Sequence, residues 1–128
     1  MAVYGVGAYY DEDVSQEFIR GGIVGVGWND NEAPELREYF QSMKVGDIVY
    51  IKAAAFGAEN ITVKAIGLIS DSVFVRDSNM VSTGRNVKWL ITDRFVIPRP
   101  IERNNVRSNT VYEEFHPEVL RVIIDRIN

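Results

Sequence analysis

Apolar residues in this chain fall into short runs that polar or glycine-containing segments separate. Several runs are rich in Val, Ile and Tyr, and residues 47–54 alternate as a half-buried strand does. We therefore predict five or six short strands, of which 47–54 and 61–69 are expected to pair as a hairpin. The predicted strands cover residues 2–10, 22–28, 47–54, 61–69, 73–75 and 87–95.

One internal segment has both the spacing and the end signals of a helix. Pro34 suits a first helical position, and Gly46 supplies a C-terminal stop. Between them, four apolar residues recur at helical spacing. These residues are Leu36, Tyr39, Phe40 and Met43.

Helices are also predicted near the two ends of the chain. Residues 13–20 are expected to form one or two turns that Asp13 caps. Thr110 and Glu113 have the spacing of a capping box, and a segment with a broad apolar face follows from Pro117. We expect this last helix to pack on the sheet.

The order of these elements predicts an α+β fold, a small curved β-barrel with peripheral helices. Gly22, Gly25 and Gly27 interrupt one strand, which indicates tight bending of the barrel or a close backbone approach. At 128 residues, the chain fits a single domain over residues 1–128.

The composition excludes several kinds of chemistry. The chain has no cysteine and one histidine, which excludes thiol nucleophiles, iron-sulfur clusters and multi-histidine metal centres. That histidine, His116, precedes Pro117 at a predicted helix start, and no nucleophile and base are paired by the sequence. We therefore predict a protein that is not an enzyme and that has no catalytic residue, metal or cofactor.

The distribution of charge matters more than its sum. A net charge of −4 argues against sequence-blind coating of DNA, yet residues 76–107 carry seven basic side chains against three acidic ones. Arg85 and Lys88 in this segment are candidate contacts to a phosphate backbone, and a solvated surface is an equally compatible interpretation. No apolar run approaches the roughly 20 residues of a membrane helix, and no signal peptide is recognisable, so we expect a soluble, cytoplasmic protein.

Four segments are informative through their shared order along the chain. They are the glycine-containing strand that ends at Trp28 and residues 43–49, 61–67 and 85–90. In this order they resemble the PUA-like superfamily, and within it the EVE-type and restriction-associated N-terminal domains that read modified bases. The resemblance implies a PUA-like domain that binds modified DNA or RNA, or a nucleotide, in restriction or phage defence.

The same resemblance implies a pocket in which aromatic rings hold a base. Trp28, Tyr10 and Phe56 would form its walls, because aromatic faces stack on bases. The neighbouring polar residues Asn29, Asp30 and Asn31 would bond to the base edge. For any one of the three aromatics, packing in the core is the favoured alternative, and we interpret Trp89 as a core residue.

A second function remains open. The chain is also compatible with a protein-interaction module that docks a larger nuclease or motor protein. The apolar C-terminal helix or an edge strand would then form the docking surface.

Overall fold

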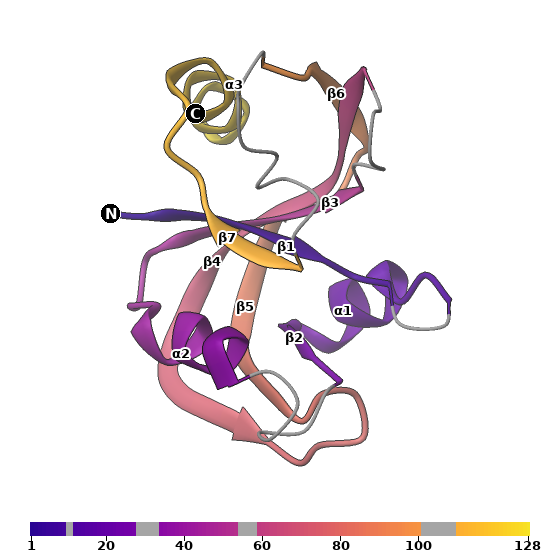
Figure 1. Ribbon diagram of the computed structural model, residues 1–128, viewed down its shortest axis with the longest axis vertical. Coiled ribbons are helices and arrows are strands. Elements are labelled where there is room, and N and C mark those ends of the chain that lie inside the picture. The colour runs from indigo at the N-terminus through magenta and orange to yellow at the C-terminus, as the bar shows by residue number, and fades with distance from the viewer. Residues whose placement is uncertain (10–11, 28–33, 54–58, 101–109) are drawn as a thin grey trace.

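The computed structural model describes residues 1–9, 12–27, 34–53, 59–100 and 110–128, which form a small α+β domain (Figure 1). The predicted α+β class is therefore confirmed. The described strands are β1 (Val3–Gly7), β2 (Ile23–Val26), β3 (Ile48–Ala53), β4 (Asn60–Arg76), β5 (Thr83–Ile91), β6 (Phe95–Pro98) and β7 (Val111–Glu113). The described helices are α1 (Ser15–Gly21), α2 (Pro34–Ser42) and α3 (Pro117–Ile127).

The long strand β4 organises a mixed sheet with the order β2-β5-β4-β3-β1-β7. Its antiparallel pairing with β3 confirms the predicted hairpin, and β5 and β6 follow one another along its other edge. β1 lies parallel to β3 and antiparallel to β7. The order ends at β2 and β7, so the described strands form an open sheet. The predicted closure into a barrel is not seen among them.

Two predicted strands have different bounds in the structure. Residues 73–75 belong to β4, which bulges after Ile69 and then pairs again with β5 at Phe74. The polar residues Ser70, Asp71 and Ser72, which interrupt the apolar pattern, lie in this bulge. The predicted strand 87–95 ends in β5 at Ile91, and its last residue, Phe95, begins β6; both strands pair with β4.

The capping box predicted at Thr110 and Glu113 was wrong. Val111 and Tyr112 are buried in β7, because this short strand pairs with β1. α3 begins at Pro117 as predicted, and His116 is its N-cap, whose Nδ1 accepts the Glu118 N–H at 3.2 Å. The prediction of a histidine at a helix start is therefore confirmed.

The helices cover both sides of the sheet. α3 lies on one side of β1, β3 and β7, whereas α1 and α2 lie on the other (Figure 1). Val119 and Ile123 of α3 are fully buried against the sheet, which confirms the predicted packing of this helix. In the described part of the chain, no helix has the length and apolar character to cross a membrane.

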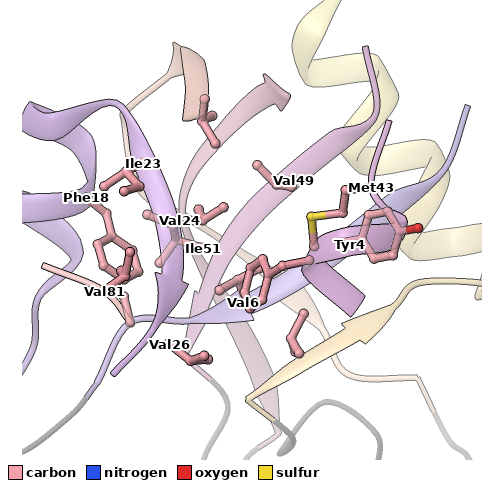
Figure 2. Packing of buried hydrophobic residues seen from close by; sticks show 14 of the residues in the cluster. Tyr4, Val6, Phe18, Ile23, Val24, Val26, Met43, Val49, Ile51 and Val81 are labelled. Carbon is pink, nitrogen blue, oxygen red and sulfur yellow. The ribbon is translucent and has the colours of Figure 1, made fainter. Parts of the chain in front are cut away.

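On the opposite side, α1 and α2 close a larger core. Figure 2 shows its side chains running from Phe18 and Val81, through Val6, to Met43 and Tyr4. α2 contributes Leu36 and Phe40, the inward positions of the predicted helical pattern.

Local geometry explains why glycine stands at two positions in residues 21–27. Gly22 has φ +63° and caps the C-terminus of α1, instead of starting the next strand as predicted. Gly25 pairs with Gly84 of β5, and a Cβ on Gly25 would lie 2.4 Å from the Thr83 carbonyl oxygen. The predicted close backbone approach is therefore present at Gly25.

The turn before β3 is held by the buried carboxylate of Asp47. Oδ1 accepts the Ala2 N–H at 3.0 Å, and Oδ2 accepts the Lys44 N–H at 2.8 Å. This carboxylate ties the start of β1 to the start of β3, which gives the Gly-Asp pair at 46–47 a structural role.

Candidate nucleic-acid interface

The predicted base pocket falls on segments outside the described residues. These predicted pocket residues are Tyr10, Trp28, Asn29, Asp30, Asn31 and Phe56. What the structure describes is the set of strand ends that lead to them.

The strand ends before Tyr10 and Phe56 lie side by side. β1 and β3 are parallel neighbours, and Gly7 near the end of β1 pairs with Lys52 near the end of β3. β2, which precedes Trp28, ends instead where Val26 pairs with Thr83 at the start of β5. The sheet therefore groups the strand ends before Tyr10 and Phe56, but not the strand end before Trp28.

Four described residues gather just beyond the end of β1, and we call them the cationic corner: Tyr9, Asp13, Lys64 and Arg94. Tyr9 and Asp13 form an isolated backbone bridge, and the Tyr9 side chain is strongly exposed, at 70%. Lys64 and Arg94 come from β4 and from the residue before β6, next to the pair Val63↔Phe95. An exposed tyrosine is thus paired through its backbone with the residue whose carboxylate contacts both cations.

Asp13 joins the cations of this corner. Its Oδ2 lies 2.7 Å from Lys64 Nζ and 3.9 Å from Arg94 Nη2. Its Oδ1 accepts the Ser15 N–H at 2.8 Å, which is the capping role predicted for it, although Val14 is the N-cap residue. Partial burial opposes ionisation, but hydrogen bonds from Lys64 and Ser15 outweigh it and hold the pKa of Asp13 well below its usual range.

Lys52, near the end of β3, is a cation outside the cationic corner. It lies on the side of the sheet that α3 covers. The Lys52 side chain is buried, and its Nζ lies 5.6 Å from the centroid of the Tyr112 ring. Burial, and after it the charge of Arg99, lower the pKa of Lys52 to about 8. Lys52 therefore belongs to the interior of the domain.

Next to Lys52, a buried polar network links β3, β7 and the start of α3. The Tyr50 hydroxyl lies 2.8 Å from the Tyr112 hydroxyl and donates to Glu114 Oε1 at 2.7 Å. Glu114 Oε2 accepts the His116 N–H at 3.1 Å. Gly5 leaves room for the Tyr112 ring, since a Cβ there would lie 2.4 Å from ring atom Cζ. The mutual hydrogen bonds give these buried groups a structural role.

The prediction that Arg85 contacts phosphate is contradicted by its burial. Its side chain is 1% exposed, and its guanidinium donates to the carbonyl oxygens of Phe40 (2.8 Å), Met43 and Asp71 (2.9 Å). The guanidinium also lies 5.2 Å from the centroid of the Phe74 ring. We call Arg85 and these four partners the arginine clamp. The clamp joins the C-terminal end of α2 to the bulge of β4. It also supplies N–H donors at the end of α2, where the last carbonyl groups of a helix have no partner within the helix.

The other predicted residues of β5 divide between surface and interior. Lys88 is exposed, opposite Leu68 of β4, as a phosphate contact requires. Trp89 packs against the larger core, and its indole N–H donates to the Phe18 carbonyl oxygen at 2.9 Å. Because Trp89 is half-buried, the interpretation of it as a core residue is confirmed in part.

A family model described as "Domain of unknown function (DUF8426)" matches residues 29–114, more than half of the chain. The chain belongs to this family. The matched segment includes Lys64, Lys88 and Arg94 of the features above, whereas Tyr9 and Asp13 precede it. Among curated proteins, none matches the chain.

The cationic corner was missed by the sequence analysis. Its residues are far apart in the chain, and only the pairing of β4 with β6 brings Lys64 close to Arg94. One signal was present: Lys64 is a lone charge in the otherwise apolar and β-branched segment 61–69. Such a charge needs either a buried partner or a place at the rim of the sheet.

Proposed function

We propose that the protein is a non-catalytic nucleic-acid-binding domain whose contact surface includes the cationic corner. The observation that carries the proposal is the exposure of Tyr9, 70%, next to the backbone of Asp13, whose carboxylate contacts Lys64 and Arg94. Proteins that bind single strands combine such rings, on which bases stack, with cations that follow the phosphate backbone. Lys88, exposed on β5, is a further candidate contact to the phosphate backbone.

The net charge of the chain is compatible with this proposal. At −4, the whole molecule repels a polyanion at long range. Binding then depends on a few local cations, and its affinity falls with salt by a small slope, in contrast to that of a basic coating protein.

The finer proposal is that the domain reads a modified base or nucleotide. By its resemblance to PUA-like readers, we propose that Tyr10, Phe56 and Trp28 hold the base, with Asn29, Asp30 and Asn31 at its edge. The adjacent ends of β1 and β3 support the grouping of Tyr10 with Phe56. A cytoplasmic role in restriction or phage defence, with a nuclease or motor partner that supplies the chemistry, belongs to the same proposal.

The docking alternative has weaker support. The apolar face of α3, one of its two proposed docking surfaces, is already covered within the chain, because Val119 and Ile123 are fully buried against the sheet. The other, an edge strand, is represented by β2 and β7 at the ends of the strand order. We therefore rank nucleic-acid binding first.

Two exposed aromatics provide a matched test. Tyr9 lies beyond the end of β1, whereas Phe115, 72% exposed, lies near its start, where the Glu114 N–H donates to the Val3 carbonyl. We would titrate labelled oligonucleotides, unmodified or carrying methylated or hydroxymethylated bases, and follow fluorescence anisotropy. Tyr9→Ala should weaken binding about tenfold, as expected for one lost stacking contact, and Phe115→Ala should change it less than about twofold.

Equal effects of the two substitutions, or no binding of any oligonucleotide at low salt, would refute the proposed surface. The pocket is tested separately. Trp28→Ala should abolish the preference for the modified base while the circular dichroism spectrum stays unchanged. A preference that survives Trp28→Ala would remove Trp28 from the pocket.

A further inference from the structure

We propose that Asp13 occupies a phosphate-binding subsite between Lys64 and Arg94, and that its carboxylate sets how tightly the domain holds a nucleic-acid phosphate. This inference rests on the proposed function and assigns a role to a residue that precedes the matched family segment.

The geometry is that of one oxyanion shared by two cations. A single oxygen of Asp13 lies 2.7 Å from Lys64 Nζ and 3.9 Å from Arg94 Nη2. A phosphate oxygen has the same charge and accepts the same N–H donors. The arrangement around Oδ2 is therefore one that a phosphate oxygen could adopt in place of the carboxylate.

The three side chains differ in their access to solvent. The Lys64 side chain is 13% exposed, that of Asp13 41% and that of Arg94 54%. Lys64 is thus largely removed from water and needs an anion beside it in any state of the protein. Asp13 and Arg94 are open enough for an incoming phosphate to reach the shared position.

Asp13 is also held in place from its own side. Oδ1 accepts the Ser15 N–H at 2.8 Å, so the carboxylate stays near the cations without a ligand. A phosphate must then compete with a carboxylate of the same chain. Asp13 weakens phosphate binding and limits the domain to ligands that add other contacts, such as a base stacked on Tyr9.

The test is Asp13→Asn, which removes the negative charge but keeps an oxygen that can accept the Ser15 N–H. Glu17→Gln is the matched control, because it removes one negative charge from α1, where Glu17 Oε1 lies 3.5 Å from Nη2 of the exposed Arg20. Both would be titrated with one single-stranded oligonucleotide at several salt concentrations. A further series would add inorganic phosphate as competitor.

We expect Asp13→Asn to bind the oligonucleotide about three- to tenfold more tightly than the wild type, with a steeper salt dependence by about one phosphate contact. Glu17→Gln should stay within about twofold. Inorganic phosphate should compete better against the Asn variant than against the wild type. An affinity of Asp13→Asn no higher than that of Glu17→Gln would overturn the inference.

Failure of the two proposals gives different results. If neither the wild type nor Asp13→Asn binds any oligonucleotide at low salt, both proposals are overturned. If the wild type binds and Asp13→Asn binds no better, only the role of Asp13 is overturned. Should Asp13→Asn not fold, Arg94→Gln at the exposed position replaces it. This variant should lower the salt slope by about one, and an unchanged slope would overturn the subsite.

Discussion

The arginine clamp and the cationic corner each contain an arginine, and the surroundings of the two arginines contrast. Arg85 lies in β5 and Arg94 lies just before β6, and both strands pair with β4. In the clamp, Arg85 is 1% exposed and directs its guanidinium at three backbone carbonyl groups. In the corner, Arg94 is half exposed and has a distant ion pair with Asp13, at 3.9 Å.

The difference shows what decides the role of a cation in this protein. The Arg85 N–H groups satisfy carbonyls at the end of α2 and in the β4 bulge, so the side chain stabilises the fold. Arg94 and Lys64 share one carboxylate, which another oxyanion can replace. The charge alone, which the sequence shows for all three residues, does not separate these roles.

The largest expected effect is on the clamp. Arg85→Met should lower the free energy of unfolding by about 3 kcal/mol or more, because three buried carbonyl groups lose a charged donor. Urea denaturation followed by circular dichroism measures this, with Arg85→Lys as an intermediate case that keeps the charge. Unchanged stability together with lost oligonucleotide binding would restore Arg85 as a phosphate contact.

The next effect separates the closely packed interior from the strand end near the corner. Gly5→Ala should destabilise the protein by about 2 kcal/mol, because its Cβ would lie 2.4 Å from the buried Tyr112 ring. Gly7→Ala, two residues along β1, would meet its nearest atom at 3.6 Å. We expect this variant to be neutral or about 0.5 kcal/mol more stable, since alanine loses less entropy in a strand. Equal unfolding midpoints for the two variants would contradict the packing of Tyr112 on Gly5.

A third effect depends on pH and distinguishes the buried Lys52 from the lysine of the corner. The pKa of Lys52 is lowered from 10.5 to about 8, so between these values the unfolded state binds more protons than the folded state. Stability should therefore rise with pH, by about 2 kcal/mol between pH 8 and 10. Lys52→Met should remove this rise in urea denaturation curves, whereas Lys64→Met should keep it. A rise that persists in Lys52→Met would assign the effect to another group.

The smallest effect completes the comparison of the two arginines. Arg94→Met should change the free energy of unfolding by less than about 0.5 kcal/mol, because exposed ion pairs contribute little to stability. The loss in free energy of unfolding should therefore be severalfold smaller for Arg94→Met than for Arg85→Met. A loss of stability at Arg94 comparable to that at Arg85 would mean that the corner, like the clamp, is part of the folded framework.

Much of the secondary structure follows from local patterns. The apolar spacing after Pro34 predicted α2, and Pro117 with the apolar face after it predicted α3. Strand β7 was missed, because its three residues acquire a strand conformation only through pairing with β1, more than a hundred positions earlier. The predicted closure of the sheet into a barrel is not seen among the described strands. Closure depends on long-range strand pairing, which no local pattern specifies.

The sequence by itself determined the α+β class, most of the elements, and the absence of thiol chemistry from a chain that has no cysteine. The tertiary structure alone decided that Arg85 is buried, and it alone brought Lys64, Arg94 and Asp13 together. The physical reason is that burial and ion pairing depend on strand register. The contacts that form the register join residues tens of positions apart, whereas helix and strand periodicity depends only on near neighbours.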